Sequence, residues 1–286
     1  MKKSILILMV FLMMLSGCGV SKNKEKTEKD NFLVAVSIPP EEEFVRRVCE
    51  DKAEILTLIP PGSSPETYEM SPKDIARLSE SDVYFSIGVP AEEASIMPSA
   101  EDLNDVQLDE YVKQFYLDLT LDGGRDPHVW LSAKRAIAMV EKIAQSMAIL
   151  DVENKDFYFK NANEYISELM ATDGEIRDLI ENSNTRDFIV FHPSFGYFAD
   201  EYGLNMYALE KDGKEPSVAQ MAQMVDFSKE LGINAVFYQS ESDSSRARVF
   251  AEEIGAKAVE LSPLAENYKE NLLSMAKTIV GANEVE

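Results

Sequence analysis

Short apolar runs alternate with amphipathic segments along most of this chain, and that alternation constrains the fold more than any other feature. The runs 32–38 and 53–59 have no helical period and indicate buried strands, with a helix at 41–49 between them. Further strands are expected at 83–87, 188–191, 235–238 and 258–261. The alternation predicts an α/β fold with mostly parallel sheets and helices on both faces.

Several segments carry signals for helices. Ser71 is placed to cap a helix that starts at Pro72. Asp74, three residues after the cap, is acidic, so the pattern is close to a capping box. Amphipathic helices are expected at 131–150, 220–231, 245–254 and 267–280. The stretch from about 90 to 125 is less regular, and no element is predicted there.

The segment 153–181 is longer than the other predicted helices. Its apolar residues recur at helical spacing, and they are Tyr158, Ala162, Tyr165, Leu169, Ile176 and Leu179. A helix of this length would span roughly 40 Å. It is either one helix kinked at Gly174 or a rigid spine helix that joins two lobes. A length of 286 residues favours two lobes. We expect these at 31–152 and 185–286, with 153–184 as the linking helix.

The charge of the chain excludes one class of partner. There are 51 acidic against 28 basic residues, and the formal net charge is -23. Such a surface repels phosphate backbones, so no nucleic-acid partner is expected, whereas cations and basic partners remain compatible.

The N-terminus has the pattern of an export signal. Two lysines precede an apolar run, 5–15, that is too short to span a bilayer. The following Leu15-Ser16-Gly17-Cys18 resembles the lipobox of bacterial lipoproteins. It predicts removal of 1–17, a lipid on Cys18 and a tether at 18–30; the alternative is an ordinary buried cysteine. Cys49 then has no partner, so neither a disulfide framework nor a cysteine metal cluster is expected.

The chain has only two histidines, and both lie at boundaries of regular structure. His128 follows Asp126-Pro127, and His192 follows the predicted strand 188–191. Ligands of α/β proteins bind beyond the carboxyl ends of strands, and imidazole is the commonest neutral metal ligand. These residues alone leave two interpretations open, namely metal ligands or unrelated surface and core histidines.

Several motifs occur together in a characteristic order. They are Pro-Pro-Gly-Ser-Ser-Pro-Glu-Thr-Tyr-Glu at 60–69, Ile-Gly-Val at 87–89, Asp-Pro-His-Val-Trp-Leu-Ser at 126–132, the long helical stripe, Phe-His-Pro-Ser-Phe-Gly-Tyr-Phe at 191–198, Gly-Lys-Glu-Pro-Ser at 213–217 and Val-Phe-Tyr-Gln-Ser-Glu at 236–241. With these motifs the mature chain resembles the ZnuA/TroA-like family, the metal-binding lipoproteins of bacterial ABC importers, over essentially its whole length.

The resemblance implies a set of ligands. In most relatives the first loop carries a metal-binding histidine, and here that position is Glu66, whose carboxylate is also a competent ligand. His128 and His192 match the next two ligands. We expect backbone carbonyls or acidic neighbours such as Glu69 or Glu215 to orient the imidazoles.

The fourth ligand of the family departs from the pattern. The family's carboxylate position falls on Ser262 in this chain. Either water completes the site or another carboxylate substitutes, and Glu241, after the predicted strand 235–238, is the candidate. The alternative is that Gln239 and Glu241 lie in a solvated loop.

The predicted ligands suit Zn²⁺, and also Mn²⁺ or Fe²⁺; the usual affinity order puts zinc ahead of manganese. Many zinc-binding relatives carry a histidine-rich loop, but 91–125 contains no histidine. The resemblance implies a monomer, anchored through Cys18 at the extracytoplasmic face of a bacterial membrane. It would capture the cation between two lobes and deliver it to an ABC permease, with little lobe motion.

Two other functions are compatible with parts of this pattern. Two histidines, a glutamate and an open water position also describe a zinc hydrolase. The sequence has no H-E-x-x-H, G-x-S-x-G or P-loop motif and no G-x-G-x-x-G after a strand, so no enzyme is expected. The third possibility is an adhesin with the same fold.

Overall fold

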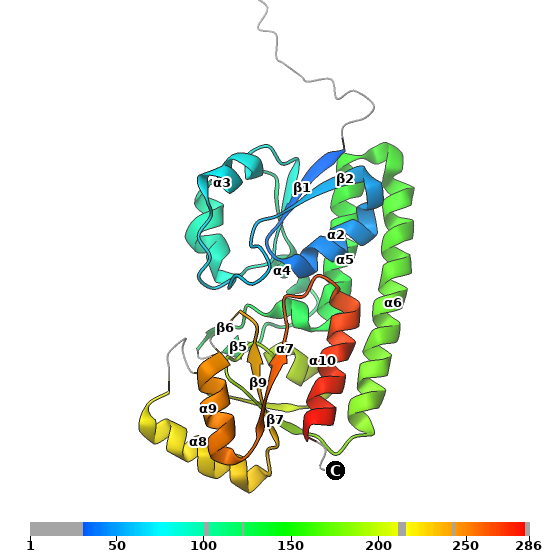
Figure 1. Ribbon diagram of the computed structural model, residues 1–286. Helices are drawn as coiled ribbons and strands as arrows, with labels where there is room; N and C mark the ends of the chain where they lie inside the picture. The colour runs from blue at the N-terminus through cyan, green and yellow to red at the C-terminus, as the bar shows by residue number, and fades with distance from the viewer. Residues whose placement is uncertain (1–30, 100–102, 122, 211–215, 242–243, 284–286) are drawn as a thin grey trace, which may run out of the picture. The chain divides into compact units, whose positions relative to one another are not determined.

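The computed structural model describes residues 31–99, 103–121, 123–210, 216–241 and 244–283 (Figure 1). The predicted signal, Cys18 and the tether lie outside these residues, as does Glu215. None of the helices in the described ranges is both long and apolar enough to cross a membrane.

The first sheet is parallel and has the strand order β2-β1-β3-β4. Its strands are β1 (Phe32–Val36), β2 (Ala53–Thr57), β3 (Val83–Ser86) and β4 (Asp105–Gln107). The helices of this region are α2 (Pro39–Cys49), α3 (Pro72–Leu78) and α4 (Leu108–Val112). Ser71 caps α3 as predicted, because its side chain accepts a hydrogen bond from the Asp74 amide.

The second sheet is also parallel and has the order β10-β9-β7-β8. Its strands are β7 (Asp187–Val190), β8 (Asn205–Ala208), β9 (Ala235–Gln239) and β10 (Lys257–Leu261). The accompanying helices are α7 (Gly196–Tyr202), α8 (Val218–Leu231), α9 (Ser244–Ile254) and α10 (Tyr268–Asn283). The predicted α/β class is confirmed. The short elements β4, α7 and β8 were not predicted.

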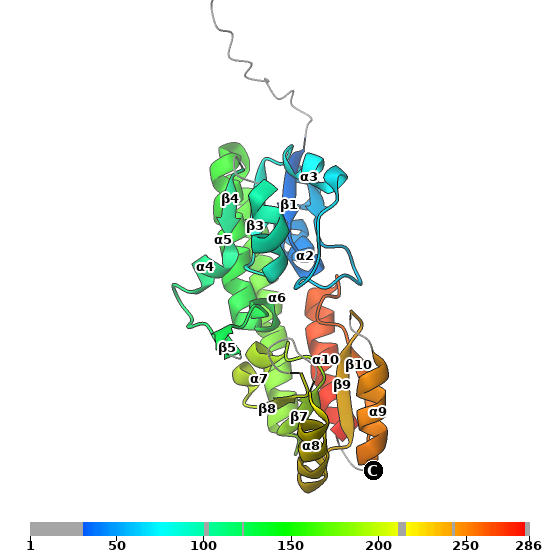
Figure 2. The ribbon, with the colours of Figure 1, turned by 90° about the vertical axis from the view of Figure 1, so that its left-hand side faces the viewer.

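Two long helices run beside the sheets: α5 (Ala133–Leu150) lies along the first sheet, and α6 (Lys155–Glu181) extends past both (Figures 1 and 2). Helix α6 packs against α5, α2 and α10. The helix α6 continues through Gly174 without a break, which agrees with the predicted spine rather than with an interruption. The exact lobe boundaries stay a prediction.

The remaining elements are short. They are the hairpin β5 (Thr120–Leu121) and β6 (Gly124–Arg125), the π-helical turn η2 (Glu92–Ile96), and the 3₁₀ turns η1 (Glu50–Lys52), η3 (Met97–Ser99), η4 (Val129–Leu131) and η5 (Val152–Asn154). Most of them lie in the stretch from about 90 to 125, for which no element was predicted.

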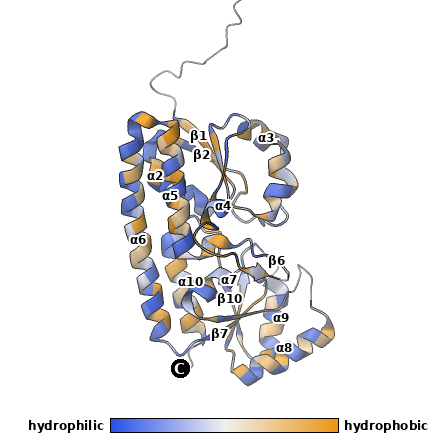
Figure 3. Ribbon diagram, turned by 180° about the vertical axis from the view of Figure 1, so that it is seen from behind, coloured by the Kyte–Doolittle hydropathy of each residue, from blue (hydrophilic) through white to orange (hydrophobic). Residues whose placement is uncertain are grey.

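One hydrophobic core serves both sheets. Val34 and Phe85 of the first sheet belong to the same buried cluster as Phe188 and Phe237 of the second. The long helices supply the connection, and Figure 3 shows their alternating hydrophobic and hydrophilic residues. A smaller cluster around Phe250 lies at the α8 and α9 side of the second sheet.

The segment before α10 returns to the first half of the chain. The Trp130 indole N–H donates to the Pro263 carbonyl at 2.9 Å, and the Tyr268 hydroxyl donates to the Trp130 carbonyl at 2.6 Å. The Tyr268 amide donates to Glu43 of α2, and its ring packs edge-on against Phe44 with centroids 4.8 Å apart. These contacts tie the C-terminal helix to the region that holds the first sheet.

Candidate metal site

Three of the predicted site residues lie together. Glu66, His128 and His192 each offer one ligand atom, and these atoms all lie within 4.8 Å of one another. Glu66 comes from the loop between β2 and α3, His128 from the segment after β6, and His192 from the end of β7. The two imidazole rings meet edge to face, with centroids 5.5 Å apart. Residues far apart in the sequence therefore form one cluster.

The parallel pairing of β7 with β8 sets the surroundings of His192. Val190 lies opposite Ala208, and the ladder continues beyond the strands because the Glu210 amide donates to the Phe191 carbonyl at 2.9 Å. Glu210 is thereby placed beside His192, and its Oε2 lies 2.9 Å from His192 Nδ1. The other ring nitrogen, Nε2, lies 2.9 Å from Glu66 Oε1.

Both carboxylates act on the protonation of His192. Burial alone would lower the pKa of this imidazole, but its hydrogen bonds to Glu210 and Glu66 outweigh burial and raise the pKa to about 9. The hydrogen bond from His192 in turn holds the pKa of Glu66 below its usual value against the effect of burial. At neutral pH the pair is an imidazolium and a carboxylate, so a cation that binds at Nε2 must displace a proton.

His128 is buried, with 3% of its surface exposed, and is fixed by Asp126. One carboxylate oxygen, Asp126 Oδ1, accepts the His128 amide at 2.9 Å and lies 2.8 Å from Nδ1. Gly196 leaves room for this arrangement, because a Cβ there would overlap with Asp126 Oδ2. In both histidines Nδ1 meets a carboxylate, which leaves Nε2 as the atom to offer a cation.

Glu69, one of the two acidic residues predicted to orient the imidazoles, does not do so. Glu69 is exposed, and Glu215 lies outside the described residues. The residues that hold the two imidazoles are Asp126 and Glu210 instead. Asp126 lies two residues before His128 in the Asp-Pro-His motif, and this spacing could have predicted its role. Glu210 would have followed from its place just beyond β8, had that strand been recognised.

The structure does not bring Glu241 into the cluster of three. Its Oε1 accepts from the Ser240 hydroxyl at 2.7 Å, while its Oε2 is buried with no hydrogen-bond partner among the described residues. The Gln239 amide donates to the Ser194 hydroxyl, and the Ser262 carbonyl accepts from Asn271. Glu241 as the fourth ligand stays a prediction.

The family model described as "Zinc-uptake complex component A periplasmic" matches residues 34–282. The chain belongs to the ZnuA family. That description is of an uptake component, in agreement with the prediction that the protein is not an enzyme.

Individual relatives agree with the family. The high-affinity zinc uptake system protein ZnuA of Bacillus subtilis is 30% identical over 271 residues, which cover 88% of this chain and 85% of that protein. The zinc-binding lipoprotein AdcA of Streptococcus pneumoniae is 28% identical over 92% of this chain, which spans only 55% of that longer protein. A crystal structure of a ZnuA deletion mutant with zinc bound superposes with a TM-score of 0.83 at 32% identity, covering 90% of this chain and 100% of that one.

Proposed function

We propose that this protein is an extracytoplasmic solute-binding protein that captures Zn²⁺, or Mn²⁺ as the alternative cargo, and delivers it to an ABC importer. The observation that carries the proposal is the cluster of Glu66, His128 and His192, in which each imidazole has its Nδ1 on a carboxylate. This is the arrangement by which proteins fix the tautomer of histidines that bind metal through Nε2.

Capture of the cation exchanges a proton for a divalent ion, so the site gains one positive charge. The cation replaces the proton on His192 Nε2, and the direct bond between Glu66 and His192 opens so that both can face it. Ligand atoms of a tetrahedral zinc site lie about 3.3 Å apart, given bonds of about 2.0 Å. The three atoms, within 4.8 Å of one another, need only a small approach. Glu210 keeps its hydrogen bond to Nδ1 of His192 and stabilises this imidazole when the cation is bound.

Zinc is the preferred cargo on chemical grounds. Two imidazoles and a carboxylate suit Zn²⁺, and the general affinity order places Mn²⁺ well below it. The relatives reported above are also named for zinc. Water or Glu241 completes the coordination. A Glu241→Gln variant decides between them, since only a direct ligand would cost substantial affinity.

We further propose that the mature protein is a monomer held at the outer face of the membrane by a lipid on Cys18. The lipobox-like Leu15-Ser16-Gly17-Cys18 supports this anchor, and the Streptococcus relative is named a lipoprotein. The permease partner follows from the family. No specific observation favours the adhesin alternative.

Replacement of Glu66 by alanine tests the site. If three ligands share a binding free energy of about 10 kcal/mol, loss of one weakens Zn²⁺ binding roughly 250-fold. Isothermal titration calorimetry with a competing chelator measures the affinity. Glu69→Ala, an exposed carboxylate in the same loop, is the matched control and should change it little. Equal affinities of the two variants would remove Glu66 from the site, and failure of the native protein to bind either cation would refute the transport function.

A further inference from the structure

A buried glutamate outside the ligand cluster organises the turn that follows β3. Glu92 is only 4% exposed, and its carboxylate accepts the Ile87 amide at 2.9 Å and the Gly88 amide at 2.6 Å. It also accepts the Ser37 hydroxyl, which follows β1. One side chain thus fixes the backbone at the carboxyl ends of two adjacent strands.

The same turn holds the loop that carries Glu66. The Ala91 amide donates to the Pro65 carbonyl at 2.9 Å, directly before Glu66 in the chain. A second tie lies one helical turn further on, where the Met70 amide donates to the Ser95 hydroxyl at 3.1 Å. The position of the Glu66 backbone therefore depends on where residues 87–95 lie.

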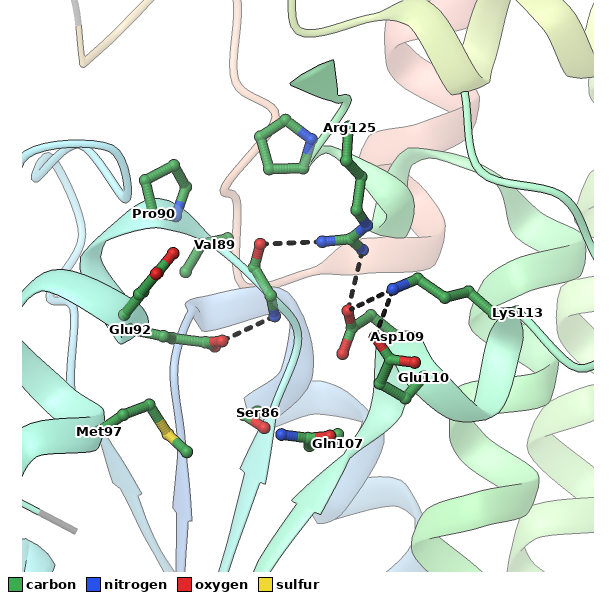
Figure 4. Close-up of a pocket in the computed structure, with 13 residues that line it drawn as sticks. Ser86, Val89, Pro90, Glu92, Met97, Gln107, Asp109, Glu110, Lys113 and Arg125 are labelled. Carbon is green, nitrogen blue, oxygen red and sulfur yellow. Dashed lines mark hydrogen bonds and ion pairs between the residues drawn. The ribbon is translucent and has the colours of Figure 1, made fainter. Parts of the chain in front are cut away.

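The turn also contacts the segment that leads to His128. Arg125 Nη1 donates to the Gly88 carbonyl at 3.0 Å. Its guanidinium also lies 3.3 Å from Asp109 in the first turn of α4 (Figure 4). Gly88 has a φ of +81°, and a Cβ there would overlap with Arg125 and Asp109. Gly88 is thus bonded on its N–H side to Glu92 and on its carbonyl side to Arg125.

We propose that Glu92 is a positioning residue of the metal site, which holds the turn 87–92 in the shape that sets Glu66 relative to His128. The inference rests on the proposed capture of Zn²⁺ and adds a residue to it. Glu92 does not belong to the cluster of potential ligands, so its effect on affinity passes through Glu66.

A carboxylate suits this role better than its amide. Both oxygens of Glu92 accept backbone amides, Oε1 from Ile87 and Oε2 from Gly88. A glutamine has one acceptor oxygen and would turn an NH₂ group toward one of these donors. Glu92→Gln therefore keeps the size of the side chain and loosens the turn.

A double-mutant cycle tests the proposal. We expect Glu92→Gln to weaken Zn²⁺ binding about tenfold in the native background and less than twofold in the Glu66→Ala background. A purely structural weakening would lower affinity by the same factor in both. Glu93→Gln is the matched control, since Glu93 is exposed and lines the same pocket of about 530 Å³ as Glu92.

A second variant keeps the test decisive if Glu92→Gln does not fold. Ser95→Ala removes only the bond to Met70, and its smaller loss of affinity, about threefold, should likewise vanish without Glu66. If the variants of either cycle fold and their losses of Zn²⁺ affinity are additive, the positioning role is overturned. If the native protein binds Zn²⁺ but the losses are additive, the positioning role of Glu92 is wrong while the proposed function still holds. If the native protein does not bind Zn²⁺, the proposed function itself fails.

Discussion

Glu66 and Glu92 are two carboxylates in the first half of the chain, and their surroundings shift their pKa values in opposite directions. The Glu66 side chain is 33% exposed and bonded to His192, which lowers its pKa. Glu92 meets only neutral donors, so burial dominates and raises its pKa to about 7. A buried carboxylate stays charged when a cationic group is beside it, whereas neutral hydrogen-bond donors compensate burial only in part.

The contrast separates a group that can bind a cation from one that holds the backbone. Glu66 is already paired with a positive charge, and a metal ion can take the place of that charge. Glu92 carries its proton over much of the ordinary pH range and makes contacts that need acceptor oxygens rather than charge.

The largest expected effect concerns the pH dependence of stability. The folded pKa of Glu92, about 7, lies above its usual 4.5, so the folded state binds more protons between these values. The contribution of Glu92 is fully present below pH 4.5 and is lost as the pH rises through about 7, a change of about 3 kcal/mol. Relative to native protein, Glu92→Gln should therefore gain about that much between pH 4.5 and 8.

Urea unfolding with a chelator present, at a series of pH values, measures this difference. The exposed Glu93→Gln should give a flat difference curve. A flat curve for Glu92→Gln as well would mean that Glu92 is ionised in the folded protein like Glu66, and the contrast between them would fail.

A smaller effect is expected on the affinity for zinc. Since the pKa of His192 is about 9, Zn²⁺ must displace one proton at neutral pH. Affinity should rise about tenfold per pH unit, or about 100-fold from pH 6 to pH 8. Calorimetry in buffers of different ionisation enthalpy counts the released protons. Release of far less than one proton at pH 7 would contradict the imidazolium pair.

The smallest effect should come from Glu210→Gln. This variant keeps a partner for His192 Nδ1 but removes the charge, so Zn²⁺ affinity should fall about tenfold, the lower end for orienting carboxylates. The pKa of His192 should also fall, which nuclear magnetic resonance can follow. Glu260→Gln, an exposed residue of β10, is the control. An unchanged His192 pKa would show that Glu66 alone sets it.

The sequence predicted the elements with strong periodicity and the residues in motifs. The buried stripe of α6 and the cap at Ser71 were predicted correctly because their spacing is local. The strand β8 was missed, since its four residues are exposed or half-buried and lack the buried apolar run that marked β7, and Glu210 was missed with it. Glu92 was unpredictable because its role depends on Ser37, which is 55 positions away and meets it only after the sheet has formed.

The return of the C-terminal segment bears on the order of folding. Glu43 and Tyr268 are bonded across 225 positions, and Trp130 and Pro263 across 133. Closing such long loops is entropically costly, so we expect these contacts to form late. Until they do, Phe44 lacks the ring that covers it, and the Trp130 indole lacks its acceptor. We therefore expect the first half of the protein to complete its packing only when the last helix docks.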